Sequence, residues 1–355
     1  MHLLLAFALL SIPPVQSGEP NRQVAIGTDR GFTAVVFGSH NSIWFAGSRD
    51  SGRSFSSPVH IADVSALALG RHRGPRVIVS GNHIVVSAIF GQTAGQGPHA
   101  HGLPSDGNLV AWRSTDSGQH WSQPVVINDA PSSAREGLHA MAVNKPGEIA
   151  AVWLDLRSSG TRLFGAFSRD YGATWSKNAQ LYASPTGTIC QCCDPSIAAL
   201  SDAHRFAIMF RNVSGGSRDM YTMNWNTRGG TSEAHKIGVG TWPLDACPMD
   251  GGGIARIHSH TVSAWRRDHT VYLAEDQKPE IALAEGKDVA LAATPQGAYV
   301  AWTDAEGVKL HTPKSSRVLN LSAAGGAFPT LLAMPDQSVL AAWERDKQIE
   351  FAIVE

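Results

Sequence analysis

One turn pattern, Ser-x-Asp-x-Gly-x-x-aromatic, occurs three times and constrains the fold of this chain more than any other feature. The copies are SRDSGRSFS, STDSGQHWS and SRDYGATWS, which begin at Ser48, Ser114 and Ser168. In such a turn the aspartate accepts backbone N–H groups, the glycine takes a positive φ, and the aromatic ring packs between neighbouring units. A turn repeated every ~55–65 residues indicates a chain built from similar units. We therefore interpret the pattern as structural.

Short apolar runs, most of them ending in tryptophan or phenylalanine, recur between turns. They cover residues 34–37, 85–90, 149–153, 206–210, 261–265, 298–302 and 339–343. Each follows one apolar run and precedes another, and no window shows the 3.6-residue period of a helix. This arrangement predicts an all-β fold, a single β-propeller of four-stranded antiparallel blades. The count is seven blades in one domain over residues 18–355, and the seventh unit lacks a fourth strand of its own.

The first seventeen residues, MHLLLAFALLSIPPVQS, are typical of a signal peptide. An apolar run from Leu3 to Ile12 is followed by two prolines and then by small residues that suit signal peptidase. We expect cleavage after Ser17 and a secreted or periplasmic protein. A buried terminal strand and an uncleaved anchor are the alternatives for this segment.

The charge balance argues against two classes of partner. The chain of 355 residues has a formal net charge of -1, so it carries no basic excess for nucleic acid or an anionic membrane. No later segment approaches the ~20 apolar residues of a membrane span. We expect a monomer with a small or glycan ligand.

The repeated turns resemble the Asp boxes, or BNR repeats, of the sialidase superfamily. The phrases AREGLHAMA, CQCCDPS and ACPMDGGG are similar to a bacterial group of secreted sialidase-like proteins. The resemblance implies six blades as the alternative to seven. It also implies exo-sialidase-type cleavage of an anionic sugar, with three arginines that grip a carboxylate, an aspartate as acid/base, and a tyrosine–glutamate nucleophile pair.

The resemblance maps unevenly onto this sequence. Arg76 and Arg211 match two of the three arginines by position, Arg266 or Arg267 matches the third, and Asp106 matches the acid/base. Asp194 is the nearest carboxylate to the position of the nucleophilic glutamate. Where the tyrosine would begin an inner strand, the sequence has Lys287 and Asp288.

Strand polarity gives a second, independent argument about the site. If strands A to D run from the channel outward, each A strand begins and each B strand ends at one end of the channel. Most of the unusual charged residues fall at that end, and we take these as substrate-binding or catalytic candidates: Arg76, Arg135, Glu136, His139, Asp155, Arg157, Arg162, Asp194, Arg211, Arg218, Asp219, Asp250 and Arg266. Arginines there suit a planar carboxylate or sulfate, and a protonated carboxyl would serve as general acid. The alternative is that the arginines form ion pairs with Asp155, Asp219 and Asp250 and only hold the loops together.

Four cysteines lie in two loops that should be neighbours: Cys190, Cys192, Cys193 and Cys247. In an exported protein a disulfide between the first three and Cys247 is the default expectation, and no cofactor is needed. The compact Cys-x-Cys-Cys cluster is also suited to a soft metal such as copper or zinc, with His139 or Met249 nearby.

The sequence thus favours a secreted glycoside hydrolase of sialidase type. A non-catalytic propeller that binds a glycan or protein, and a metalloprotein that uses the cysteine cluster, are the rival hypotheses.

Overall fold

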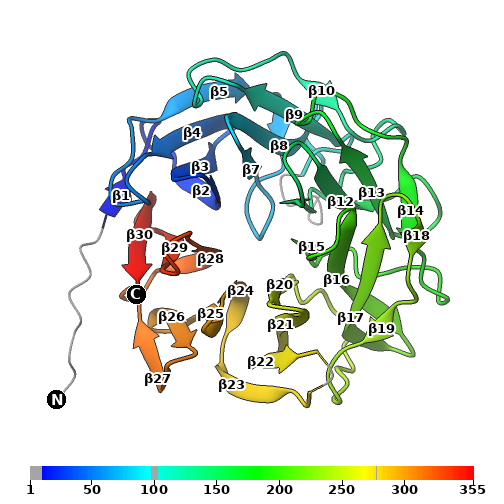
Figure 1. The fold of residues 1–355 in the computed structure, drawn as a ribbon. Coiled ribbons are helices and arrows are strands. Elements are labelled where there is room, and N and C mark those ends of the chain that lie inside the picture. Colours follow the sequence, from blue (N-terminus) through cyan, green and yellow to red (C-terminus); the bar gives the residue numbers. More distant parts are fainter. Residues whose placement is uncertain (1–9, 97–102, 277) are drawn as a thin grey trace.

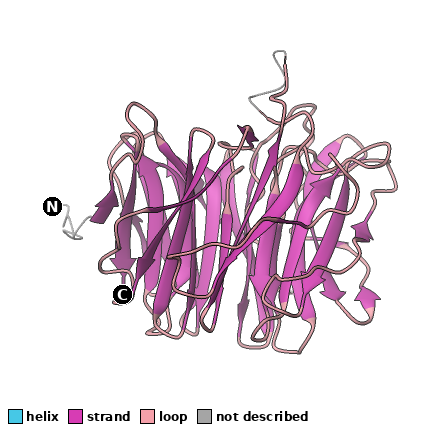
Figure 2. Ribbon diagram, turned by 90° about the horizontal axis from the view of Figure 1, so that it is seen from above, coloured by secondary structure: helices cyan, strands magenta, loops and turns pink. Residues whose placement is uncertain are grey.

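Seven antiparallel sheets stand around a central channel in the computed structural model of the protein (Figure 1). The structure describes residues 10–96, 103–276 and 278–355, so the first nine residues of the expected signal peptide lie outside it. Every regular element in these ranges is a strand (Figure 2). Within them, no helix is long and apolar enough to cross a membrane. The predicted all-β propeller and its count of seven blades are confirmed, and the six-bladed alternative is wrong.

The first four blades follow the chain from its N-terminal side. Blade 1 contains β2 (Asn21–Asp29), β3 (Phe32–Ser39), β4 (Ser42–Ser48) and β5 (Val59–Asp63), and blade 2 contains β6 (Ala66–Leu67), β7 (Arg76–Ser80), β8 (His83–Gly91), β9 (Asn108–Ser114) and β10 (Val125–Val126). Blade 3 contains β11 (His139–Val143), β12 (Ile149–Asp155), β13 (Arg162–Ser168) and β14 (Ala179–Tyr182), and blade 4 contains β15 (Ser196–Ala199), β16 (Arg205–Ser214), β17 (Ser217–Asn226), β18 (Gly230–Thr231) and β19 (His235–Lys236).

The remaining three blades complete the ring. Blade 5 contains β20 (Gly253–Ile257), β21 (His260–Arg267), β22 (Thr270–Glu275) and β23 (Ile281–Glu285), and blade 6 contains β24 (Lys287–Thr294), β25 (Gly297–Asp304), β26 (Gly307–Thr312) and β27 (Ser315–Asn320). Blade 7 contains β28 (Ala327–Ala333), β29 (Val339–Arg345), β30 (Gln348–Val354) and β1 (Leu10–Ile12).

The fourth strand of blade 7 comes from the other end of the chain. In β1, Leu10 pairs with Phe351 and Ile12 pairs with Ile349, both on β30. Ile12 is only 4% exposed, and the side-chain amide of Asn21 donates to the carbonyl oxygens of Ile12 and Pro13. The ring is therefore closed by a sheet that joins both ends of the chain. These residues lie inside the segment expected to be cleaved, and their strand matches the alternative of a buried terminal strand.

The three repeated turns are held by the hydrogen bonds that their sequence predicts. The carboxylates of Asp50, Asp116 and Asp170 accept backbone N–H groups four residues further on, at 2.9, 3.0 and 2.9 Å. The glycine of each turn has a φ between 77° and 87°, a conformation that favours a residue without a Cβ. This structural role is confirmed.

Aromatic side chains fill the spaces between blades. Phe55, which ends the first repeated turn, lies 4.7 Å (centroid to centroid) from Phe351 of blade 7. Four tryptophans near the ends of B strands are almost completely buried: Trp153, Trp265, Trp302 and Trp343. Their large apolar surfaces stabilise the contacts between neighbouring sheets, and so they belong to the core and not to a carbohydrate platform.

One end of the channel collects the A-strand starts and the B-strand ends of all seven blades, and we call it the channel mouth. The loop between β6 and β7, which contains His72 and Arg73, projects from blade 2 towards the centre of the ring (Figure 1). The repeated turns connect C and D strands and therefore lie on the opposite face. Strand polarity thus brings side chains from different blades to one place.

Candidate functional site

A cavity of about 200 Å³ lies at the channel mouth. Its polar lining comes from blade 1 (Gln23), the β6–β7 loop (His72), β7 (Arg76) and the loop before β15 (Asp194). This volume is smaller than the ~300–1,000 Å³ of most ligand sites. Such a cavity suits a terminal group of a larger molecule.

The inner strands of three blades are distorted where they begin. Irregular register at the start of β2, β24 and β28 places Gln23, Asp288 and Phe328 at φ values of 55°, 57° and 51°. A residue with a side chain rarely adopts this left-handed conformation, and such strain concentrates at functional sites. Bulges of this kind redirect side chains next to active sites, and here they do so around the cavity.

His72 is a fixed positive charge in the cavity wall. Burial opposes its charge, but Asp194, a hydrogen bond from Nε2 to Asp288 Oδ1 (3.2 Å) and Asp250 outweigh burial and raise the pKa of His72 to about 9. The imidazole is therefore protonated at neutral pH. A histidine in this state donates from both ring nitrogens, which suits an anionic ligand.

Arg76 is the second cation of the cavity. Its guanidinium donates to the carbonyl oxygens of His72 (2.7 Å), Gly74 (3.3 Å) and Pro75 (3.1 Å), which fixes the β6–β7 loop. Burial lowers the pKa of Arg76, and Asp194 opposes that effect. A guanidinium has five N–H donors, so two donors remain for a ligand in the cavity.

Carboxylates face these cations from three blades. Asp194 accepts the backbone N–H of Gly251 (3.0 Å) and also lines the cavity. Asp250 is 1% exposed and accepts the backbone N–H groups of Asp288 (2.8 Å) and Val289 (3.3 Å). Burial raises the pKa of Asp250, and the neighbouring Asp288 adds to the rise. The mouth therefore combines two cations with several acidic groups.

Glu344 near the end of β29 is an acidic group that the sequence analysis missed. Its Oε1 accepts the backbone N–H (2.7 Å) and the side-chain amide (2.9 Å) of Gln23, which lines the cavity. Burial raises the pKa of Glu344 to about 7, although these hydrogen bonds and the charges of Arg22 and His72 act against the rise. Glu344 thus holds a proton up to neutral pH, as a general acid must.

Comparison with known proteins identifies the fold. No protein-family model matches the sequence, and no curated protein matches it. The NanB sialidase from Streptococcus pneumoniae superposes with a TM-score of 0.55 and 10% identity, over 98% of this chain and 70% of that chain. A Trypanosoma rangeli sialidase in complex with 2,3-difluorosialic acid gives a TM-score of 0.52 and 14% identity, over 97% of this chain and 56% of that chain. The fold is a sialidase-like β-propeller.

The sialidase-like propeller does not gather the three arginines in the expected way. Arg211 is 1% exposed and donates to the carbonyl oxygens of Arg218 (2.9 Å), Asp250 (3.0 Å) and Arg266 (2.9 Å). Its guanidinium carbon lies 5.2 Å from the ring centroid of Trp242, and that of Arg266 lies 5.3 Å from the same ring. Arg211 and Arg266 therefore share one indole, whereas Arg76 lines the cavity. The clamp of three converging guanidiniums is absent from the described residues.

Arg266 is held by its own neighbours. Its Nε donates to the carbonyl oxygen of Asp268 (2.6 Å), and its Nη1 lies 3.7 Å from Asp250 Oδ2. Because Asp250 and Trp242 cover this guanidinium, Arg266 matches the scaffolding alternative more closely than the ligand-binding one.

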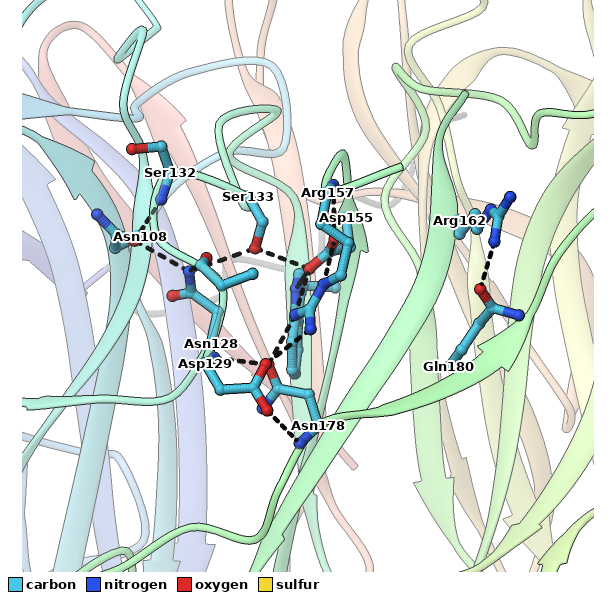
Figure 3. Close-up of polar contacts among 12 residues, drawn as sticks. Asn108, Asn128, Asp129, Ser132, Ser133, Asp155, Arg157, Arg162, Asn178 and Gln180 are labelled. Atoms are coloured by element: carbon cyan, nitrogen blue, oxygen red, sulfur yellow. Dashed lines mark hydrogen bonds and ion pairs between the residues drawn. The ribbon is translucent and has the colours of Figure 1, made fainter. Parts of the chain in front are cut away.

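Asp155, the last residue of β12, and Arg157 form a closed network in blade 3 (Figure 3). The Asp155 carboxylate accepts Ser133 Oγ and Trp153 Nε1, each at 2.8 Å, and the backbone N, Nε and Nη2 of Arg157, each at 2.9 Å. Arg162 stands apart and donates to Gln180 Oε1 at 2.7 Å. Since its lone pairs are already used, Asp155 holds loops together and is not free to act on a substrate.

Asp106 also holds a loop. Its carboxylate accepts the backbone N–H groups of Gln92 and Thr93, both at 3.1 Å, and it is not among the described residues that line the cavity.

His139 is fully buried and exchanges a 2.8 Å hydrogen bond with Ser87 Oγ. Burial lowers the pKa of His139, with Arg76 acting in the same direction, so this imidazole is neutral.

The loop before β11 contributes support from blade 3. Arg73 Nε donates to the carbonyl oxygen of Glu136 at 2.7 Å, while Arg135 is exposed. Burial raises the pKa of Glu136, against the charges of Arg73 and Arg135. Asp219 accepts the backbone N–H of Trp242 at 2.9 Å, and so fixes the indole that covers the neighbouring arginines.

The four cysteines are free thiols. Sγ of Cys190 lies 3.5 Å from that of Cys192 and 3.4 Å from that of Cys193, beyond the ~2.05 Å of a disulfide. Cys247 is exposed, and the other three are buried. The structure therefore does not contain the disulfide that we expected between the cluster and Cys247. The three buried thiols are brought together instead.

A larger cavity of about 660 Å³ lies among the outer strands of blades 1 and 2. Aromatic side chains such as Phe90, Trp112 and Trp121 line it, and Asp63 is the charged residue in its lining. A single carboxylate without a cation beside it in the lining offers little chemistry, whereas the mouth of the sialidase-like propeller holds paired cations and acids.

Proposed function

We propose that the protein is an exported glycoside hydrolase that binds a terminal anionic sugar at the channel mouth and cleaves its glycosidic bond. The observation that carries this proposal is the pair of cations, His72 and Arg76, in the wall of a small cavity that also contains Asp194. A carboxylate or sulfate on a sugar ring would accept hydrogen bonds from both cations. The size of the cavity favours the end of a glycan, and therefore exo-cleavage.

Two acidic groups would have different roles in the reaction, one as general acid and one as general base. Glu344 stays protonated up to about pH 7 and would donate its proton to the oxygen of the leaving group as the C–O bond breaks. Asp194, which lines the same cavity as His72 and Arg76, would accept a proton from the water that attacks the anomeric carbon. A carboxylic acid that protonates the leaving group and a carboxylate that activates water are the common machinery of glycoside hydrolysis.

Two further features support the proposal. The NanB and T. rangeli proteins, which have similar folds, are sialidases, and a sugar acid is the kind of ligand that His72 and Arg76 suit. The apolar N-terminal run supports export to a secreted or periplasmic location. Because the described residues lining the cavity include no tyrosine, the proposal relies on carboxyl groups and not on a phenolic nucleophile.

A panel of fluorogenic glycosides tests the proposal. Sialosides and uronides should be cleaved, and neutral hexosides should not. Glu344→Gln should abolish turnover while binding of the free anionic sugar, measured by calorimetry, is retained. Asp106→Asn is the matched control, because that carboxylate holds a loop outside the cavity. Binding without any turnover would refute hydrolysis and leave a glycan-binding propeller, and the absence of both would refute the site.

A further inference from the structure

Three buried cysteines form a cluster that the proposed hydrolysis does not use. The sulfur atoms of Cys190, Cys192 and Cys193 all lie within 4.8 Å of one another, and each residue is 4% exposed or less. They belong to the loop before β15, which is held to blade 4 by a backbone hydrogen bond from Cys190 N to Arg211 O (2.9 Å). The thiols therefore converge from a short, anchored loop.

Positive charge lies beside the cluster. Arg218 Nη1 lies 3.3 Å from Cys190 Sγ. Arg211 is buried close by, and its Nε has no partner among the described residues. Guanidinium groups stabilise thiolates, which are the form of cysteine that binds metals. Two arginines beside three thiols would offset the charge that such a group acquires.

The group offers sulfur ligands alone. Within the described residues, the ligand cluster contains no histidine or carboxylate oxygen, and Val213 and Met249 pack against it. Soft thiolates in an apolar pocket select soft ions such as copper(I). Zinc in structural sites takes four ligands in a tetrahedron, and the fourth cysteine, Cys247, is exposed and stands outside the group.

We propose that Cys190, Cys192 and Cys193 bind one copper(I) ion through three thiolate sulfurs. The S···S distances of 3.4 and 3.5 Å are about 0.5 Å shorter than the ~4.0 Å that three metal–sulfur bonds of about 2.3 Å at 120° produce, so rotations of the side chains complete the site. Binding releases the protons of any thiols that are still protonated.

The position of the site gives it a structural consequence. Asp194 follows Cys193 directly and lines the cavity at the mouth. A metal ion bound by the three cysteines would therefore fix the backbone that positions the Asp194 carboxylate. The metal site does not depend on hydrolysis, and it would stand even if the cavity bound no sugar.

Anaerobic competition with bathocuproine disulfonate tests the proposal. The full chain, reduced and freed of metal, should take up one copper(I) per molecule, and X-ray absorption should show a shell of sulfur atoms only. Cys192→Ser and Cys193→Ser should each weaken copper binding by about 100-fold or more, because losing a ligand costs at least as much as losing an outer-sphere partner. Cys247→Ser is the matched control and should bind copper as the wild type does.

Two further readouts keep the proposal falsifiable if a cluster variant folds poorly. Copper(I) should raise the Tm of the wild type and of Cys247→Ser, because a ligand that binds only the folded state stabilises it. Equal loss of copper in the Cys247→Ser variant would overturn the assignment of ligands. Preference for zinc(II) over copper(I), or failure of the fully reduced wild type to retain copper, would overturn the proposed metal.

Discussion

Replacement of Asp155 by alanine tests whether this carboxylate has a structural or a catalytic role. In the wild type, this carboxylate accepts hydrogen bonds from Ser133, Trp153 and Arg157 at 2.8–2.9 Å. The alanine variant leaves the buried Trp153 indole N–H and the buried Ser133 hydroxyl without their acceptor. Each stranded group costs ~1–3 kcal/mol, and loss of one partner of a buried ion pair costs ~3–5 kcal/mol. Because these groups belong to one hydrogen-bond network, their costs overlap and do not add, and we expect a total loss of ~3–5 kcal/mol.

Equilibrium unfolding in urea measures this loss, and thermal unfolding of this 355-residue chain should show a fall in Tm of roughly 4–7 °C. Asp129→Ala is the matched control, because Asp129 contacts the same Arg157 (2.6 Å) but its side chain is 47% exposed. An exposed ion pair contributes ~0–1 kcal/mol, so the control should lose no more than that. If Asp155→Ala kept wild-type stability and lost sugar binding or turnover instead, the scaffolding assignment would be refuted.

Three further predictions concern the mouth and the closure of the ring. Glu344→Gln should be more stable than the wild type above pH 7, by up to ~3 kcal/mol, and equally stable below pH 4.5. The reason is that the pKa of Glu344 is raised to about 7, so its buried charge destabilises the fold only as pH rises. Equal stability of the two proteins at all pH values in urea unfolding would contradict this. The wild type should lose stability between about pH 6.5 and pH 9, since the pKa of His72 is raised to about 9 in the folded state. If a His72→Gln protein lost unfolding free energy with pH at the same rate in that range, the positive charge on His72 would be refuted. A chain that starts at Gly18 should be ~2–3 kcal/mol less stable than one that keeps β1, because Ile12 loses its burial; identical urea midpoints would show that β1 does not close blade 7.

Local patterns made most of the fold predictable. The repeated turns depend on bonds within five residues, such as Ser54 N to Asp50 Oδ1, and so sequence alone identifies them. The fourth strand of blade 7 was not predictable in the same way, because Leu10–Ile12 pairs with residues more than three hundred positions away and lies in a run that also suits a signal peptide. Long-range pairing of so short a strand leaves no periodic signal.

The end of the channel that holds the candidate site was predictable, but the directions of the side chains there were not. Strand polarity predicts that Arg76 and Arg211 lie at the same end of the channel. It does not say that Arg211 turns into the wall beneath Trp242 while Arg76 lines the cavity, because that choice depends on packing between blades. The same rule could have found Glu344, which follows Trp343 near the end of a B strand just as Arg266 follows Trp265. His72 had a weaker signal in the cation-rich stretch RHRGPR.

The crystal structure of the Glu344→Gln protein soaked with an intact anionic glycoside tests the central claim most directly. The account predicts that the carboxylate of the sugar lies within hydrogen-bond distance of Arg76 and His72, with the anomeric carbon beside Asp194. Sugar bound elsewhere, such as against Trp242 or in the aromatic cavity of blades 1 and 2, would contradict it. So would an empty channel mouth at a saturating concentration of the glycoside.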